Sequence, residues 1–457
     1  MASVLQHSCN VLPGAPLPPP TPLESVTERR LSSHTESRAS SLSRRKFFQL
    51  SGTASLLAAT PAAFAAAPRA EEGEDYYAKL GVPTIINAAG TYTTMTAACM
   101  PPSVLAAVQR AALHPVRLHD LQVKSGEYIA KRLQCEGAIV TSGASGAISL
   151  ATAACMQNAN PGLGYLDMPQ SIDGRKNQVI VQKAHRYGYD HAMFLCGARV
   201  TEVVTMDDYK RAADQGNAVM TNFFNAAEEE DGIAGTAQIG REEWLRVAHD
   251  HTIPCHLDAA ADMPPISNLW KYTGMGFDLV AFSGGKGMRG PQNAGLLLGK
   301  KHLTDLALRN APPGDGVGRG MKVAKEQIVG MVAAVDWVLS HTEESMQGDY
   351  QKRVDLIVKH VKDIPSVTTL TVVPKIANHV PHLLIRFDPA VTGVTTQEIV
   401  AKLRAHEPSI ELNPNTGHKP NQGIPSDANT LVVGVWMLQP GEDETVAKAI
   451  RAALKKA

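Results

Sequence analysis

The sequence predicts an α/β fold in which a mostly parallel, doubly wound sheet is followed by a smaller α+β domain. Short apolar runs alternate with helical segments from about residue 138 to residue 298, a pattern typical of parallel sheets. Near residues 312–320 the chain becomes rich in glycine and proline, and the regular alternation stops. We therefore divide the 457 residues into a leader at 1–67, an N-terminal segment at 68–120, a large domain at 121–320 and a small C-terminal domain at 321–457.

The expected elements follow from the apolar patterns in chain order. A short helix is expected at 76–80, and a strand that runs into a glycine turn is expected at 83–91. In the large domain, strands are expected at 138–141, 178–181, 199–204, 218–221, 253–257, 279–282 and 294–298. Helices are expected at 102–113, 126–134, 147–156, 186–195, 207–213, 241–251 and 325–342, the first with proline in its first turn. The C-terminal domain is expected to contain strands at 370–373, 382–387 and 430–436, together with two or three helices.

Composition excludes several classes of function. Lys and Arg together number 44, as do Asp and Glu, so the chain lacks the basic excess that nucleic-acid binding requires. No apolar run of about 18 residues follows the N-terminal region, so no membrane span is expected in the mature chain. The six cysteines have no CxxC spacing, which indicates neither a zinc site nor a redox pair, and no metal site is expected.

The N-terminal region resembles an export signal. Residues 1–43 are rich in Pro, Ser and Thr and are expected to be unstructured. They are followed by Ser43-Arg44-Arg45-Lys46-Phe47-Phe48 and by an alanine-rich, weakly apolar stretch that reaches a possible cleavage site at Ala63-Phe64-Ala65. This pattern resembles a twin-arginine signal, which implies export by the twin-arginine translocase to the periplasm. The alternative is a basic patch ahead of a short helix.

Two reactive side chains follow neighbouring apolar runs in the large domain. Asp258 ends the run Ile253-Pro-Cys-His-Leu-Asp, and Lys286 follows the run Leu279-Val-Ala-Phe-Ser-Gly-Gly. Open α/β sheets bind their ligands at the carboxyl ends of the strands. An acid and a lysine in these places suit pyridoxal phosphate (PLP), because the lysine can form a Schiff base while the acid keeps the pyridine nitrogen protonated. The alternative is a surface Asp and a surface Lys in an ordinary α/β protein.

A small-residue turn supplies a candidate phosphate site. Ser142, Gly143, Ala144 and Ser145 lie between a predicted strand and a predicted helix, where backbone N–H groups and the helix N-terminus can bind a phosphate. Small turns before helices are common, so this signal gains weight only beside Asp258 and Lys286. Ser283 could add a hydroxyl to the phosphate and Arg289 could add a positive charge, although Arg289 could equally form a surface salt bridge.

Other polar residues follow predicted strands of the large domain. His185 is placed to stack on the cofactor ring, with a structural histidine as the alternative. Asn222 and Asn225 could reach the ring oxygen or the substrate. We expect Asp262 and the acidic run at 228–231 to be structural or solvated rather than catalytic.

Several stretches resemble the selenocysteine-synthase-like group of PLP fold type I (aspartate-aminotransferase-like) enzymes, which includes D-glucosaminate-6-phosphate ammonia-lyase. These are Ile86-Asn-Ala-Ala-Gly-Thr, Val140-Thr-Ser-Gly-Ala, His185-Arg-Tyr-Gly-Tyr-Asp-His-Ala, His256-Leu-Asp-Ala-Ala-Ala, Phe282-Ser-Gly-Gly-Lys-Gly-Met-Arg-Gly-Pro-Gln and Gly318-Arg-Gly-Met-Lys-Val-Ala-Lys-Glu-Gln. The resemblance implies homo-oligomers with shared active sites, in which the segments 290–292 and around Arg319 face a neighbouring chain's cofactor. The chain departs from this family in two ways. An export signal argues against a tRNA substrate, and no set of basic residues in the sequence stands out as a site for a substrate phosphate.

The resemblance favours a PLP-dependent lyase that catalyses α,β-elimination from a hydroxylated amino acid or an amino sugar acid. Lys286 would be the base that removes the proton from the substrate Cα. An amino acid racemase or epimerase is the alternative, and it would need a second acid or base such as His185 or Tyr187. An aminotransferase is a further alternative. A binding protein that kept the fold without the chemistry is the alternative outside enzymes.

Overall fold

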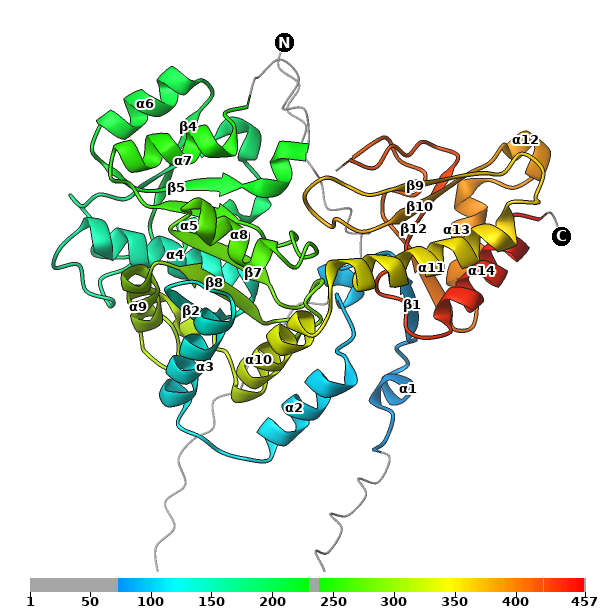
Figure 1. Cartoon of the computed structure of the whole chain (residues 1–457), viewed down its shortest axis with the longest axis horizontal. Coiled ribbons are helices and arrows are strands. Elements are labelled where there is room, and N and C mark those ends of the chain that lie inside the picture. The colour runs from blue at the N-terminus through cyan, green and yellow to red at the C-terminus, as the bar shows by residue number, and fades with distance from the viewer. Residues whose placement is uncertain (1–72, 230–237, 422, 456–457) are drawn as a thin grey trace, which may run out of the picture. The chain divides into compact units, whose positions relative to one another are not determined.

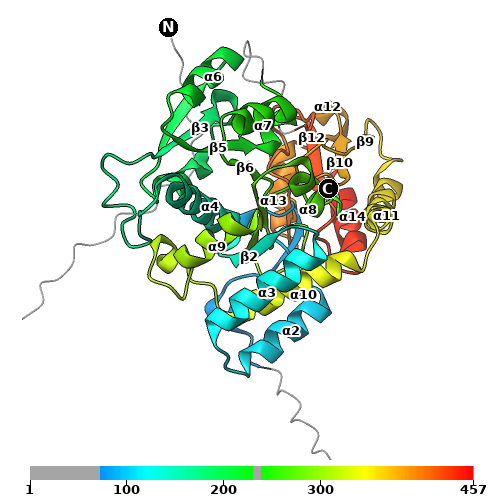
Figure 2. The same cartoon turned by 60° about the vertical axis from the view of Figure 1, so that its left-hand side comes forward.

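A seven-stranded sheet is the centre of the fold (Figures 1 and 2). The computed structural model describes residues 73–229, 238–421 and 423–455, so the expected twin-arginine signal lies outside the described residues. In spatial order the strands are β2 (Gly137–Thr141), β8 (Gly295–Gly299), β7 (Leu279–Ser283), β6 (Cys255–Asp258), β5 (Ala218–Phe224), β3 (Gln178–Gln182) and β4 (Arg199–Val203). β8 runs antiparallel to β2 and β7, whereas the other neighbouring strands are parallel. The prediction of a mostly parallel α/β sheet is confirmed.

Both faces of the sheet are buried at its central strands, which is why those strands are largely continuous apolar runs, whereas the edge strand β4 is partly exposed. Alternate residues of β7 face different cores: Leu279 and Ala281 belong to one apolar cluster, and Val280 and Phe282 belong to the other. On the first face lie α4 (Gly143–Ala159), α5 (His191–Phe194) and α9 (Lys301–Asn310). The other face carries α6 (Met206–Asp214), α7 (Arg241–Asp250) and α8 (Asn268–Met275). The strands therefore end between two layers of helices, as in a doubly wound fold.

Helices from distant parts of the sequence pack together beside the sheet. α10 (Lys325–Leu339) lies against α2 (Pro102–Ala112) and α3 (Leu118–Arg132), as Figure 2 shows. The short helix α1 (Tyr76–Leu80) precedes them in the chain. The helix expected at 325–342 ends at Leu339, because Thr342 caps a new helix, α11 (Glu343–Val361), by accepting a hydrogen bond from Ser345 N–H.

The C-terminal part is built on a small antiparallel sheet in the order β12 (Thr430–Gly434), β10 (His382–Arg386) and β9 (Thr368–Val372). α11, α13 (Thr396–Arg404) and α14 (Glu442–Ala453) share one apolar core with this sheet, and the short helix α12 (Pro389–Thr392) follows β10 in the chain. β1 (Ile85–Ala88) joins this part of the chain through parallel pairing with β11 (Ser409–Leu412), which the sequence pattern does not predict. The N-terminal segment is thereby anchored to a strand that lies more than 300 positions further along the sequence.

The segment 186–195 differs from its prediction. Instead of one helix it forms a short 3₁₀ turn, Gly188–Asp190, and the four-residue helix α5. Tyr187 is extended, with φ −156° and ψ 171°, and Gly188 follows it, so the helical run is interrupted there. This interruption turns the Tyr187 side chain out of the helical register expected for it.

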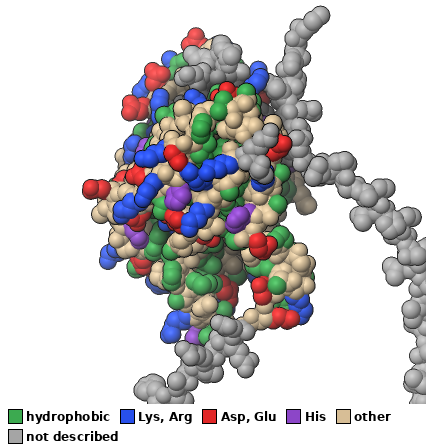
Figure 3. Space-filling view, turned by 90° about the vertical axis from the view of Figure 1, so that its right-hand side faces the viewer, with side chains coloured by type: hydrophobic (Ala, Val, Ile, Leu, Met, Phe, Trp, Pro, Cys, Tyr) green, Lys and Arg blue, Asp and Glu red, His purple; other side chains and the backbone are tan. Residues whose placement is uncertain are grey.

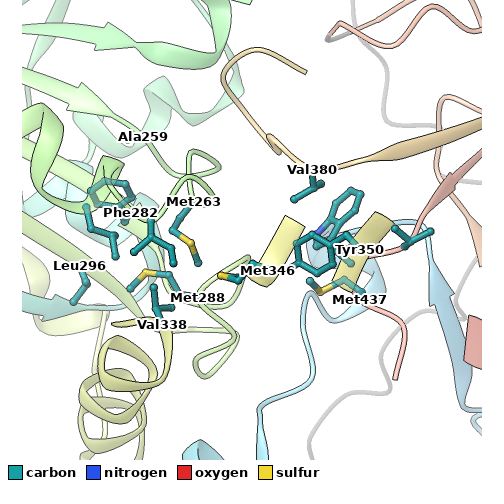
Figure 4. Close-up of a cluster of buried hydrophobic side chains, with 14 of the residues drawn as sticks. Ala259, Met263, Phe282, Met288, Leu296, Val338, Met346, Tyr350, Val380 and Met437 are labelled. Carbon is teal, nitrogen blue, oxygen red and sulfur yellow. The ribbon is translucent and has the colours of Figure 1, made fainter. Parts of the chain in front are cut away.

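Apolar packing continues from the sheet into the C-terminal part. Figure 4 shows Met263, Phe282 and Met288 in one group of buried side chains, with Met346 and Tyr350 on α11 beside it. None of the helices in the described ranges is long and apolar enough to cross a membrane. On the face drawn in Figure 3, acidic and basic side chains are interspersed with hydrophobic ones.

Candidate active site

Asp258 and Lys286 line the same cavity, which has a volume of about 210 Å³. β6 and β7 are parallel neighbours with Asp258 opposite Ala281, so both strands end at the same edge of the sheet. The remaining lining is aromatic or small: Thr91, Tyr92, Thr93, Tyr187, Tyr189, Phe224, Ala226, Ala260, Ala261, Ala377, Asn378 and Trp436. The acid and the lysine chosen from the sequence thus lie together, as parallel strand ends require.

Asp258 is a buried acid with two donors from its own chain. Only 3% of the residue is exposed. Its Oδ1 accepts a hydrogen bond from the Ala260 N–H at 2.9 Å, and its Oδ2 accepts one from the Tyr187 hydroxyl. Burial raises the pKa of Asp258, whereas these two hydrogen bonds and the charge of Lys286 lower it.

Lys286 lies in a tight turn between Gly285 and Gly287, where any larger side chain would collide with neighbouring backbone atoms. A Cβ on Gly287 would lie 2.1 Å from the Met263 carbonyl oxygen, and a Cβ on Gly285 would lie 2.6 Å from the Gln292 Cα. The turn after β7 therefore packs directly against the loop that follows Asp258. Burial lowers the pKa of the Lys286 amine, and the charge of Asp258 opposes this. A neutral, nucleophilic amine is favoured by that burial.

An aromatic pair stands beside Asp258. The Tyr187 ring stacks on Phe224, with a centroid separation of 4.1 Å and an interplanar angle of 14°. His185 does not line the cavity: it is fully buried, its Nδ1 accepts a hydrogen bond from the Phe224 N–H at 3.2 Å, and its Nε2 lies 3.1 Å from Gln238 Oε1. The structure therefore places His185 behind the cavity wall, in place of the ring-stacking position expected for it, and places Tyr187 on the wall.

Asn222 and Asn225 are also buried in the protein rather than open to the cavity. His256 and Asn222 are joined by a 2.7 Å hydrogen bond between adjacent strands. Asn225 donates through Nδ2 to Asp262 Oδ2 at 2.5 Å, and the Tyr272 hydroxyl donates to the same oxygen at 3.2 Å. Burial raises the pKa of Asp262 to about 7. Both asparagines therefore make hydrogen bonds that link buried residues of neighbouring strands and loops.

The small-residue turn forms the N-terminus of α4. Ser142 is the N-cap but its side chain makes no capping hydrogen bond, and Gly143 has φ +68° with open space where a Cβ would stand. A Cβ on Gly295 would lie 2.5 Å from the Gly143 carbonyl carbon, and Gly295 is paired with Ser283 at the end of β7. Ser283 therefore lies next to the start of α4. Ala144 and Ser145 complete the first turn of the helix, outside the set of residues that line the 210 Å³ cavity.

Arg289 is directed to the C-terminal part of the chain. Its guanidinium donates to the Trp436 carbonyl oxygen and lies 5.9 Å from the centre of the Trp337 ring. Burial lowers the pKa of Arg289. Its residue conformation has φ +53°, which turns the backbone after Lys286. In this arrangement Arg289 supports the cavity wall at Trp436, whereas the sequence led us to expect that it would add a positive charge to the phosphate site.

No protein-family model matches the chain, but individual known proteins are similar to it. The chain is 25% identical over 388 residues to the 5′-C-glycyluridine monooxygenase-decarboxylase of a Streptomyces species, a match that covers 83% of this chain and 92% of the relative. It is 26% identical over 372 residues to the D-glucosaminate-6-phosphate ammonia lyase of Salmonella typhimurium, covering 79% and 95%. A solved structure of D-glucosaminate-6-phosphate ammonia-lyase superposes with a TM-score of 0.68 at 23% identity, covering 83% of this chain and 98% of that one.

The chain has the fold of the PLP-dependent enzymes of fold type I. Its sequence relatives include a D-glucosaminate-6-phosphate ammonia lyase and an L-seryl-tRNA(Sec) selenium transferase, each 25–26% identical to this chain. This agrees with the resemblance drawn from the motifs around Asp258 and Lys286.

The residues present fit PLP at each end of the cofactor. At the phosphate end, the uncapped N-terminus of α4 and the open space at Gly143 leave backbone N–H groups free for an anion. At the pyridine end, Asp258 offers a buried carboxylate. In the cavity beside Asp258, Lys286 supplies the amine, and Ala260 lines the cavity with a side chain small enough to admit a flat ring. These residues would hold the cofactor.

The sequence did not single out several residues of the cavity wall. Thr91 and Tyr92 come from the loop after β1, Asn378 precedes β10, and Trp436 follows β12. Asn413 links two of these parts, since its Nδ2 donates to the Ala89 carbonyl at 2.9 Å and lies 3.3 Å from the Tyr92 hydroxyl. The Asn-Ala-Ala-Gly-Thr motif and a tryptophan at the end of an apolar run were the available signals, but neither reveals which cavity it will join.

Proposed function

We propose that this protein is a PLP-dependent lyase that eliminates water across Cα and Cβ of a hydroxylated amino acid or an amino sugar acid, after which hydrolysis of the enamine product by water releases ammonia and a 2-keto acid. The single observation that carries the proposal is that Asp258 and Lys286 line the same cavity. The similarity to an ammonia lyase over 79% of the chain supports the class of reaction. Lyase chemistry on the same fold is also consistent with the TM-score of 0.68 to the solved ammonia-lyase structure.

Bound PLP would supply an electron-accepting ring that stabilises negative charge at the substrate Cα. Lys286 would take the Cα proton, because burial lowers the pKa of its amine and leaves it neutral more readily. The cavity places that amine among aromatic and alanine side chains, which keep bulk water away from the reacting atoms. Asp258 would hold the pyridine nitrogen, and the α4 N-terminus would hold the phosphate.

The cavity also bears on the substrate. Among its described lining residues, Lys286 is the one basic side chain, so this wall offers no second cation for a phosphorylated substrate. We therefore expect an unphosphorylated hydroxy amino acid or amino sugar acid rather than the sugar phosphate named for the Salmonella relative.

A reaction survey tests the proposal. Purified protein with PLP is incubated with D- and L-serine, D- and L-threonine and D-glucosaminate, with and without oxygen, beside Lys286→Ala. Release of a 2-keto acid and ammonia in equal amounts, independent of oxygen and absent from Lys286→Ala, is the expected result. Inversion at Cα without ammonia would favour the racemase. Oxygen uptake with release of carbon dioxide would favour the reaction named for the Streptomyces relative. Either of these outcomes would overturn elimination.

We also propose that the protein is exported and acts as a homo-oligomer. Ser43-Arg44-Arg45-Lys46-Phe47-Phe48 supports recognition by the twin-arginine translocase. Gln292 is exposed, and Arg319 is about half exposed beside Asp315, so both are available for a partner subunit. Replacement of both Arg44 and Arg45 by lysine should abolish export of a fused reporter. Light scattering of the mature protein should give a multiple of the chain mass.

A further inference from the structure

The Tyr187 side chain is fixed at both ends. Its ring is stacked on Phe224, with centroids 4.1 Å apart, and its hydroxyl donates to Asp258 Oδ2. Tyr189 packs at an angle beside it, with a centroid separation of 5.6 Å and an interplanar angle of 57°. The Tyr187 side chain is therefore held both through its ring and through its hydroxyl group.

The surroundings of Asp258 work against its ionised form. The carboxylate is buried, and the acids Asp190 and Asp262 lie near enough to disfavour a further negative charge. Lys286 and the Ala260 N–H favour the ionised form. Among all these influences, the hydrogen bond from Tyr187 is the largest that lowers the pKa of Asp258. Tyr187 itself stays a donor, because burial and the neighbouring carboxylate raise the pKa of its hydroxyl.

We propose that Tyr187 is a positioning residue for the cofactor: its hydroxyl keeps Asp258 ionised and oriented so that the carboxylate can hold the protonated pyridine nitrogen. This inference rests on the proposed PLP function. Two of the roughly four acceptor positions of the carboxylate are taken by Tyr187 and Ala260, which leaves the others for the cofactor.

The same geometry bears on the alternative reaction. A racemase would need a second acid or base that exchanges protons with the substrate Cα. The Tyr187 proton is directed to Asp258 instead, so Tyr187 serves the cofactor-binding acid and not the substrate carbon.

The test is the pH dependence of PLP binding, followed through quenching of tryptophan fluorescence, since Trp436 lines the cavity. Wild type, Tyr187→Phe and Tyr189→Phe are compared from pH 5 to pH 9. Loss of the hydrogen bond makes Asp258 easier to protonate. In Tyr187→Phe the acid limb of the binding curve, which is the pH range over which PLP affinity falls on acidification, should therefore move up by about one pH unit. PLP binding below that limb should then be about ten-fold weaker. Tyr189→Phe should keep the wild-type limb, and the cofactor's own titration cancels in the comparison.

A double-mutant cycle with Asp258→Asn separates this role from a general packing effect. An amide at position 258 does not ionise, so adding Tyr187→Phe to Asp258→Asn should change PLP binding less than two-fold. An unshifted acid limb in Tyr187→Phe, or an equal ten-fold loss in the Asp258→Asn background, would overturn the proposal. Absence of PLP binding by wild type at every pH would instead overturn the proposed function itself.

Discussion

Lys286 owes its chemistry to burial within a turn of small residues. Its pKa is lowered by burial, whereas Asp258 and then Asp262 raise it. We predict that Lys286→Arg retains the fold but lowers the rate of keto acid formation at least about 1,000-fold, because a guanidinium stays charged and is not a nucleophile. Lys300→Arg, at a surface pair with Glu136, is the matched control and should keep wild-type activity. Comparable activity in Lys286→Arg would remove this lysine from the reaction.

Asp262 should make the stability of the protein depend on pH. Its pKa in the folded protein is about 7, above that of an unfolded aspartate. The protonated Asp262 therefore contributes to the free energy of unfolding fully below about pH 4, and this contribution is lost as the pH rises through 7. The difference between the folded and the unfolded pKa of Asp262 corresponds to at most about 4 kcal/mol in the free energy of unfolding.

Asp262→Asn cannot titrate. Urea unfolding from pH 4 to pH 8 should therefore show a smaller decline in stability for this variant than for wild type. Asp250→Asn, on the surface beside Arg246, should keep the wild-type pH profile. Equal pH profiles for Asp262→Asn and wild type would contradict the assignment.

At the scale of elements, the loop after β6 and the turn after β7 are in backbone contact at Gly287. An added Cβ would lie 2.1 Å from the Met263 carbonyl oxygen. Gly287→Ala should therefore push the Lys286 turn away from the Asp258 loop, lower the stability by about 1–3 kcal/mol and weaken PLP binding. Thermal unfolding and PLP titration measure both effects.

Gly274→Ala is the control for that substitution. It lies in α8 with open space around the missing Cβ, and it should be neutral or slightly stabilising because alanine is the better helix former. Wild-type PLP affinity in Gly287→Ala would show that the contact with Met263 does not position the lysine.

The loop after β1 depends on one side chain. Asn87 donates through Nδ2 to the Gly90 and Ala97 carbonyls and accepts through Oδ1 from the Ala89 and Gly90 N–H groups. Asn87→Ala should lower stability by about 2 kcal/mol and raise the apparent KM, because this loop carries Tyr92 onto the cavity wall. Asn429→Ala, at an exposed turn, is the control. An unchanged KM would show that the loop keeps its shape without these four hydrogen bonds.

At the scale of the whole molecule, the sequence predicts the parts governed by periodicity. The seven strands of the large sheet follow from short apolar runs, and the convergence of Asp258 with Lys286 follows from parallel strands ending at one edge. The pairing of β1 with β11 could not be predicted, because short strands carry no information about a partner so distant in sequence. The same holds for Trp436, which reaches the cavity from the C-terminal part.

The position of His185 behind the cavity wall, with Tyr187 on it, shows a second limit. Both residues follow β3 within five positions, and spacing alone brings either of them near the cofactor end of the sheet. Their directions are set by a 3₁₀ turn at 183–185 and by the extended backbone of Tyr187. Such irregular turns depend on tertiary contacts, here the Phe224 N–H for His185 and Asp258 for Tyr187, which no periodicity reveals.

The attachment of PLP to Lys286 is tested most directly by borohydride reduction of the protein with PLP, followed by peptide mass mapping. The chain has other lysines on its surface, including Lys271, Lys300 and Lys301, which serve as internal controls. Reduction should fix one phosphopyridoxyl group per chain on the peptide that contains Lys286, and Lys286→Ala should carry none. A yellow protein whose adduct lies on a different lysine, or a protein that takes up no PLP, would contradict the account.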